Sequence, residues 1–102
     1  MYIEMDVEFA NDDYDRLETD AAFDMGLAPG LVKAYRMRMQ GLRSASDERD
    51  LYAIKSWRFE KLKGNRKHQC SIRLNDQFRL VLEIQNSSEG KHLRIMQIED
   101  YH

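Results

Sequence analysis

The sequence contains one cysteine, one proline and no apolar run long enough to cross a membrane. Because Cys70 has no second cysteine to pair with, an internal disulfide and a metal cluster held by several thiolates are both excluded. A membrane-spanning helix needs about 18 consecutive apolar residues, and a secretory leader needs a basic segment followed by an apolar one. Neither pattern is present, so we expect a cytosolic protein in a reducing compartment.

Length and composition are those of a small globular protein. The 102 residues are 42% hydrophobic and 33% charged, which is too apolar for a disordered chain. We expect a single domain, residues 1–102, whose folding buries roughly 60–70% of the surface of the unfolded chain.

Charge is distributed unevenly along the chain. Residues 1–24 hold nine of the 18 acidic residues and one of the 16 basic residues, so residues 25–102 hold nine and fifteen, a net charge of +6. A basic segment of this kind indicates an anionic partner. A solvated surface that carries charges of both signs explains the same pattern equally well.

Periodicity predicts helices in the first half of the chain. In "IEMDVEF", residues 3–9, apolar and acidic residues alternate, which predicts a half-buried strand. Asn11 suits the N-cap of a first helix, which Gly26 is expected to end. Pro29 suits the first turn of a second helix, and residues 43–50 are expected to form a polar connection. The second helix has an apolar stripe for the core, formed by Leu31, Tyr35, Met39 and Leu42.

From Trp57 onward the pattern predicts a meander of strands, so the fold class is α+β in the order β-α-α-β-β-β. Two alternating runs, residues 70–74 and 78–84, are separated by three polar residues. A three-residue hairpin loop gathers the apolar side chains of both runs on one face, whereas a two-residue loop would place Arg73 beside Phe78. The three-residue loop predicts the pairs Leu74–Phe78, Ile72–Leu80 and Cys70–Leu82.

The same register places Arg73 and Arg79 directly opposite each other on the other face. Like charges so placed are destabilising by some tenths of a kcal/mol, and a phosphate between them would relieve the repulsion. The alternative is that both side chains extend separately into water. In "LKGNRK", Gly64 suits a turn with positive φ, and Lys63, Arg66 and Lys67 form a basic loop that either binds phosphates or is simply solvated.

The last strand is expected to contain a β-bulge near Met96, because Leu93 and Ile95 share a parity that Ile98 does not. The bulge leaves open whether Tyr101 or His102 shares a face with Arg79. Asp100, Tyr101 and His102 can all move protons or form hydrogen bonds, which makes the end of the chain a candidate site. No histidine pair has the helical spacing of metal ligands, so we expect no metal site and no cofactor.

Several of these segments together resemble one protein family. Residues 57–64 read "WRFEKLKG", a strand with Ser71-Ile72 follows, then Phe78-Arg79-Leu80, and residues 99–102 read "EDYH". These motifs, in this order over nearly the whole chain, resemble the HigB branch of the RelE toxin superfamily, also called plasmid maintenance system killer proteins. The resemblance implies a small, mostly antiparallel sheet with two N-terminal helices packed on one face.

The resemblance also implies a function. Such toxins are ribosome-dependent endoribonucleases that cut mRNA in the ribosomal A site. A cognate HigA-like helix-turn-helix antitoxin silences them, and the toxin–antitoxin complex binds operator DNA through the antitoxin. No membrane partner is implied.

Cleavage of RNA without a metal needs a base for the 2′-hydroxyl, cations for the phosphate and an acid for the leaving 5′-oxygen. His102 is the best candidate for proton transfer, as acid or as base, since its own α-carboxylate and Asp100 favour the protonated ring. Tyr101 would orient the nucleotide, and Asp100 would hold His102 or act as a base. The phosphate-binding candidates are Lys63, Arg79, Arg73, Arg66 and Lys67.

One residue departs from the family pattern. Glu60 stands where the family usually has a histidine, and a carboxylate accepts a proton but supplies no positive charge. Two other functions remain open at this point: a non-catalytic toxin that inhibits DNA gyrase, as in the ParE branch, and a module that binds RNA or antitoxin without cutting. Neither would need the terminal histidine.

Overall fold

The structure is a computed structural model and describes residues 6–87 and 90–101. No helix in this part of the chain is both long and apolar enough to cross a membrane. Along the chain the elements are β1 (Asp6–Phe9), α1 (Asp12–Thr19), α2 (Pro29–Ser44), α3 (Glu48–Ala53), the 3-10 turn η1 (Lys55–Trp57), β2 (Glu60–Lys61), the 3-10 turn η2 (Gly64–Arg66), β3 (Gln69–Arg73), β4 (Phe78–Ser87) and β5 (Gly90–Asp100).

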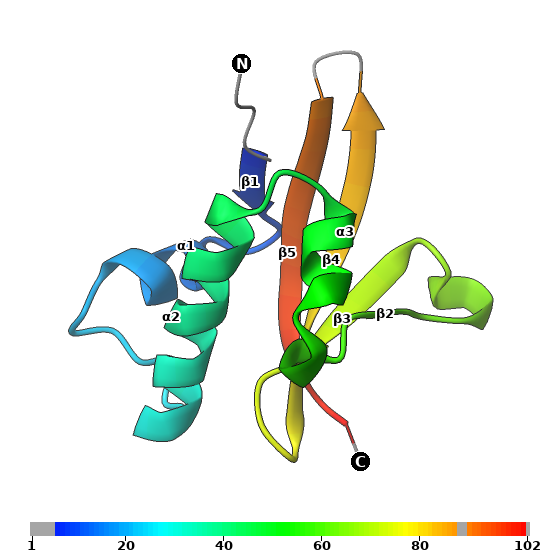
Figure 1. The fold of residues 1–102 in the computed structure, drawn as a ribbon. Coiled ribbons are helices and arrows are strands. Elements are labelled where there is room, and N and C mark those ends of the chain that lie inside the picture. The colour runs from blue at the N-terminus through cyan, green and yellow to red at the C-terminus, as the bar shows by residue number, and fades with distance from the viewer. Residues whose placement is uncertain (1–5, 88–89, 102) are drawn as a thin grey trace.

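The strands form one five-stranded sheet in the order β1-β5-β4-β3-β2. β1 runs parallel to β5, and the other neighbours are antiparallel. The helices pack on one face of the sheet (Figure 1) and leave the opposite face, here called the open face, without helices. The α+β class and the mostly antiparallel sheet are therefore confirmed.

A third helix was not predicted. Residues 43–50 were expected to be a polar connection, but α2 continues to Ser44 and α3 begins at Glu48. The Asp47 side chain accepts a hydrogen bond from the backbone N–H of Arg49 (2.8 Å) and so caps α3, while Leu51 is fully buried. A cap followed by one buried leucine is enough to form this short helix once tertiary packing covers the leucine.

The first helix ends earlier than predicted. Asn11 caps it as expected, but it ends at Thr19, and Gly26 lies in the loop before α2 with φ of 74°. In the last turn of the helix and in the loop that follows, Arg36 of α2 donates to the carbonyl oxygens of Leu17, Asp20 and Phe23. Gly26 therefore signals a positive φ in the loop rather than the end of the helix.

The predicted hairpin register is confirmed. Ile72 lies opposite Leu80 and Cys70 opposite Leu82, and Arg73 lies opposite Arg79 on the open face. The β-bulge is also confirmed: Val81 pairs with Gln97 but Leu82 pairs with Ile95, so Met96 is the extra residue. The bulge restores the apolar parity of β5 and places Glu99 opposite Arg79.

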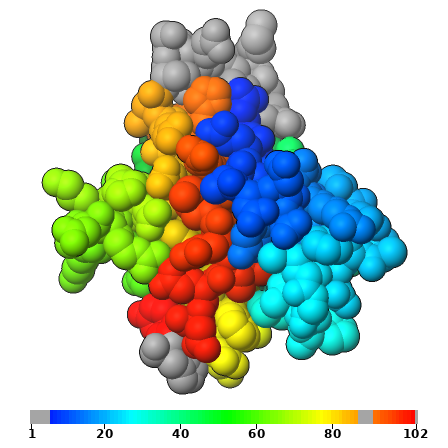
Figure 2. All heavy atoms as spheres, turned by 180° about the vertical axis from the view of Figure 1, so that it is seen from behind, coloured from blue at the N-terminus to red at the C-terminus, as the bar shows by residue number. Residues whose placement is uncertain are grey.

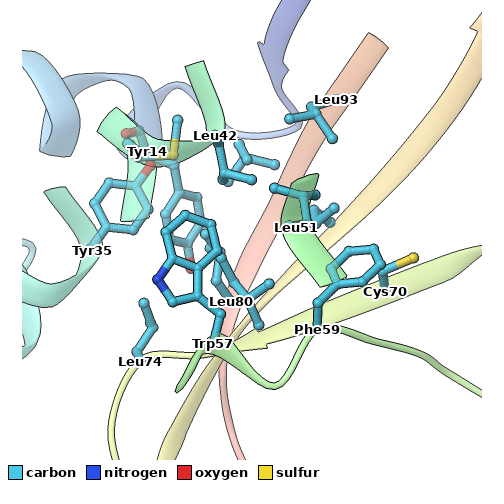
Figure 3. Close-up of a cluster of buried hydrophobic side chains, with 14 of the residues drawn as sticks. Tyr14, Tyr35, Leu42, Leu51, Trp57, Phe59, Cys70, Leu74, Leu80 and Leu93 are labelled. Atoms are coloured by element: carbon cyan, nitrogen blue, oxygen red, sulfur yellow. Dashed lines mark hydrogen bonds between the residues drawn. The ribbon is translucent and has the colours of Figure 1, made fainter. Parts of the chain in front are cut away.

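The core fills the space between the helices and the sheet (Figure 3). Tyr35, Met39 and Leu42 of the predicted α2 stripe are fully buried, and Leu31 is 4% exposed. The Tyr35 hydroxyl donates to the carbonyl of Tyr14 (2.8 Å), and the Tyr14 hydroxyl accepts from the N–H of Ile98 (3.0 Å). This chain of contacts connects α2 through α1 to the end of β5.

Gly41 of α2 has no side chain, and the ring of Trp57 occupies the space that a side chain there would fill. A Cβ atom there would lie 2.6 Å from Cζ2 of Trp57, whose rigid ring is buried against this point of the helix. The close approach of Trp57 matters for the site, because Trp57 precedes the segment that carries Arg58 and Glu60.

We predict that Gly41→Ala destabilises the fold. Overpacking against Trp57 costs about 1–3 kcal/mol, which outweighs the roughly 1 kcal/mol by which alanine favours a helix over glycine. Each kcal/mol lowers Tm by about 4–8 °C for a domain of this size. Gly30→Ala in the same helix is the control, because nothing lies within 4 Å of its Cβ. Thermal melts that show the two variants equally stable would contradict this account.

Candidate functional site

The open face of the sheet carries the polar side chains that the sequence singled out. Because successive side chains of a strand alternate between faces, Arg79 and Glu99 lie opposite the core, as do Ser71 and Arg73 of β3 and Glu60 of β2. Figure 2 shows this face, with the C-terminal residues (red) at its lower end beside the β3–β4 hairpin (yellow).

Arg79 lies at the centre of the site and is held on three sides. Its Nη1 atom is 3.3 Å from Oε1 of Glu60 and donates to the Ser71 hydroxyl at 3.3 Å. Its guanidinium carbon lies 3.8 Å from the centre of the Tyr101 ring, a cation–π contact. Only 12% of the Arg79 side chain is exposed. The guanidinium is thus fixed in direction before any ligand arrives.

Asp100 and Tyr101 are held against the β3–β4 hairpin. The N–H of Tyr101 donates to the carbonyl of Gln77 (2.7 Å), and the Gln77 side chain donates to the Asp100 carboxylate (3.0 Å). The Tyr101 side chain is 57% exposed, so its ring covers Arg79 and still faces solvent. Tyr101 therefore lies with Arg79, and His102 lies outside the described residues.

Two hollows border the Arg79–Tyr101 pair, and both residues line each of them. The larger, of about 220 Å³, is here called the arginine cleft, and its other lining residues are Arg58, Arg73, Asn75 and Asp76. The smaller, of about 80 Å³, is more apolar and is also lined by Leu62, Arg66, Ser71, Val81 and Glu99. Both are below the roughly 300–1,000 Å³ of sites for drug-sized ligands, a size that suits a phosphodiester or part of a nucleotide.

Three of the predicted phosphate-binding residues are paired with carboxylates. Arg66 donates two hydrogen bonds to Glu99, at 2.8 and 2.7 Å, and this pairing raises the pKa of Arg66 and lowers the pKa of Glu99. Arg73 is paired with Asp76, and Arg79 with Glu60. These ion pairs orient the guanidinium groups and reduce the net charge that an anion meets.

The two predicted lysines lie apart from this cluster. Lys63 is exposed just before η2, and Lys67 lies on another hollow with His68 and Cys70. Neither lines a hollow beside Arg79 in the described part of the chain. Gly64 has the expected positive φ, 67°, so the loop turns as predicted while its basic side chains diverge.

Sequence reasoning missed three residues of the site: Arg58, Glu99 as the partner of Arg66, and Ser71 as a contact of Arg79. Glu99 could have been inferred from the bulge, which sets it opposite Arg79. Arg58 gave a weaker signal, a charged residue between two large aromatic ones. Within residues 6–87 and 90–101, no group of three or more His, Cys, Asp or Glu side chains is placed to hold a metal ion.

Comparison with known proteins gives a family and a fold. The family model described as "RelE-like toxin of type II toxin-antitoxin system HigB" matches residues 7–97. Among curated proteins, none matches the chain in sequence.

Solved structures of toxins are similar in fold. The YoeB/ParE toxin from Agrobacterium tumefaciens has 20% identity and a TM-score of 0.57, covering 96% of this chain and all of that one. The E. coli DinJ–YafQ toxin–antitoxin complex has 13% identity and a TM-score of 0.57, covering 97% and 94%. The YoeB–YefM complex from Staphylococcus aureus has 20% identity and a TM-score of 0.56, covering 98% and 99%. The predicted RelE-like fold is confirmed by this likeness.

The Arg66–Glu99 pair predicts a pH-dependent stability. Because the folded pKa of Glu99 is lowered, its contribution is complete above the unfolded pKa, about 4.3, and is lost as pH falls through the folded pKa. Both side chains are more than one-third exposed, so the contribution is about 0.2–1 kcal/mol.

Glu99→Gln should therefore be less stable than wild type at pH 7, and the difference should shrink as pH falls below the unfolded pKa and disappear once pH is below the folded pKa of Glu99. Urea denaturation at a series of pH values measures this. Glu8→Gln removes an exposed carboxylate that has no ion pair among the described residues, and it should show a smaller difference at pH 7. A deficit of Glu99→Gln that stays constant down to pH 3 would rule out the ion pair as its cause.

Proposed function

The chain belongs to the HigB-like family of RelE-like toxins of type II toxin–antitoxin systems, and on this premise we propose that it is a ribosome-dependent mRNA endoribonuclease. The observation that carries the proposal is the cluster of Glu60, Arg79 and Tyr101, in which a proton acceptor and an exposed aromatic ring both contact one fixed cation. Glu60 and Arg79 would supply two of the groups that metal-free cleavage of RNA requires, a base and a cation for the phosphate, and the Tyr101 ring offers a surface on which a nucleotide base can stack.

In the proposed reaction, Glu60 takes the proton from the 2′-hydroxyl, and the 2′-oxygen attacks the adjacent phosphorus. The P–O5′ bond breaks, which leaves a 2′,3′-cyclic phosphate, and His102 donates a proton to the departing 5′-oxygen. Arg79 stabilises the charge that develops on the phosphate oxygens, because a guanidinium fixed in a partly desolvated site needs no reorganisation during the reaction. Asp100 positions His102, and Lys63, which lies outside the two hollows, contacts the RNA backbone from the basic loop.

Tyr101 has a positioning function in this scheme. Its ring lies over Arg79 on one face, and its 57% exposure leaves surface on which a base can stack. Arg73 and Arg66 support the RNA backbone from the two hollows beside it, and Lys67 lies farther along the loop as a contact to more distant phosphates or to ribosomal RNA.

The partners follow from the family. The YafQ and YoeB structures are complexes with the antitoxins DinJ and YefM. For this chain we propose a HigA-like helix-turn-helix antitoxin, through which the complex would bind operator DNA. The ribosomal A site and its mRNA are the target, so the protein acts in the cytoplasm. Inhibition of DNA gyrase is the second candidate, favoured by the name of the YoeB/ParE toxin.

Removal of His102 tests the proposal directly. Mapping of mRNA 5′-ends after brief induction should show new ends within codons for wild type, and at least about 10²-fold fewer for the deletion, because the general acid is lost. Ribosome binding should be retained. A gyrase supercoiling assay with both forms is the control: inhibition of supercoiling by both, without new mRNA ends, would favour the gyrase inhibitor and reject the nuclease.

Glu60→Gln tests the assignment of the base. Cleavage by ribosome-bound protein in a single turnover should slow by about 10²–10⁴-fold. Binding of RNA should not weaken, because the substitution removes a negative charge beside Arg79. Glu83 lies on the same face of β4 as Arg79 but forms no ion pair with it. The Glu83→Gln variant should therefore cleave RNA at the wild-type rate. Equal rates for the two variants would remove Glu60 from the mechanism.

A further inference from the structure

Arg58 has an unusual backbone conformation for a residue with a side chain. It closes η1 with φ of 48° and ψ of 47°, and its N–H donates to the carbonyl of Lys55 (3.1 Å). Trp57 and Phe59 on either side are each 7% exposed, so both neighbours point into the core while Arg58 is exposed. The left-handed turn thus lies between two aromatic residues that anchor the segment in the core.

Glycine is the usual residue for a left-handed position that ends a helical turn, because a Cβ atom is disfavoured there. Arginine therefore brings strain that glycine would avoid. The side chain shows no structural compensation: among residues 6–87 and 90–101, Arg58 forms no side-chain hydrogen bond and no ion pair. A strained residue without a structural partner points to a function outside the fold.

The arginine cleft indicates what that function is. Arg58, Arg73 and Arg79 line it together, and Asp76 is the one carboxylate among its described lining residues. Asp76 is paired with Arg73, and Arg79 is paired with Glu60. Arg58 is thus the cation of this cleft, within the described chain, whose charge is not offset by a carboxylate. The positive charge of Arg58 is therefore the one in the cleft that is most available to an entering anion.

The neutral lining of the cleft suits the same ligand. Oδ1 of Asn75 accepts hydrogen bonds from the N–H groups of Gln77 (2.9 Å) and Phe78 (2.7 Å), which leaves its NH2 group as a donor. Donors around a guanidinium match the oxygens of a phosphodiester, which accept hydrogen bonds and carry one negative charge.

We propose that Arg58 is a second phosphate-binding residue, which takes the RNA phosphate next to the one held by Arg79. This assignment rests on the proposed function, since it supposes that Arg79 holds the phosphate being cleaved. Arg58 touches no reacting atom and acts by fixing the register of the RNA strand, so that the scissile phosphate stays between Glu60 and Arg79 while Tyr101 stacks on a base.

Arg58→Gly tests the proposal without endangering the fold, because glycine relieves the left-handed strain while it removes the charge. Its Tm should equal or exceed that of wild type. Binding of free protein to a short 2′-deoxy-substituted RNA, which cannot be cleaved, is measured by fluorescence anisotropy between 50 and 200 mM salt. The affinity should fall about tenfold, and the slope of log affinity against log salt should become shallower by about 0.7, the value for one phosphate contact on a single strand.

Lys55→Ala is the matched control. It removes one exposed positive charge from the other end of the same turn, outside the arginine cleft, so its affinity should stay within about twofold of wild type. Equal losses in both variants would show long-range attraction only and overturn the proposal, as would undetectable binding by wild type at 50 mM salt. Arg58→Asn, which also tolerates the left-handed region, replaces Arg58→Gly if the glycine variant is poorly folded.

The outcome separates this assignment from the proposed nuclease. Loss of RNA affinity in Arg58→Gly, together with no mRNA cleavage by wild type on ribosomes, would keep Arg58 as a phosphate contact and reject the nuclease. Cleavage that depends on His102, together with unchanged RNA affinity of Arg58→Gly, would keep the nuclease and reject Arg58.

Discussion

The antiparallel pairing of β4 with β5 is the constraint on which the site depends. It runs from the Ser87–Gly90 pair to the Phe78–Asp100 pair, so Glu99 and Asp100 are held beside Arg79 by a ladder of backbone hydrogen bonds. The bulge at Met96 corrects the parity of β5 partway along, and the Tyr14 hydroxyl holds Ile98 just beyond it. Without the bulge, Ile98 would face solvent and Glu99 would face the core. Asp100 is thus part of the sheet, and the backbone N–H of Tyr101 donates to the carbonyl of Gln77 just beyond it.

On the open face, carboxylates orient the arginine side chains and also weaken their attraction for anions. Each guanidinium of Arg66, Arg73 and Arg79 is oriented by a carboxylate, which lowers the entropy lost when a ligand binds. The same carboxylates reduce the attraction for phosphate, so an RNA strand must share or displace them. A site of this kind holds its geometry in the absence of RNA and binds free RNA less strongly than bare arginines would. This weaker attraction is consistent with the proposed function, in which a ribosome would already hold the mRNA in position.

The two aromatic residues before the basic loop link the core to the site. Trp57 packs against Gly41 of α2, and Phe59 is buried beside it, so the segment between them has little freedom. Arg58 and Glu60, on either side of Phe59, are therefore positioned by the packing of their neighbours, and Glu60 is also held by its pairing with Ser71 and its contact with Arg79. The core residues Trp57 and Phe59 thus alternate along the chain with the site residues Arg58 and Glu60.

Local patterns in the sequence determined the parts of this protein that depend on periodicity. The register of the β3–β4 hairpin, the bulge at Met96 and the buried stripe of α2 all follow from where apolar side chains must point, and each could be predicted. Tertiary structure alone decided the rest. Arg36 takes the Leu17 carbonyl in the last turn of α1, and the buried Leu51 anchors α3. Lys67 lies away from Arg79, whereas Glu60 and Tyr101 both contact it. These outcomes depend on contacts between residues far apart in sequence, whose energies no local pattern encodes.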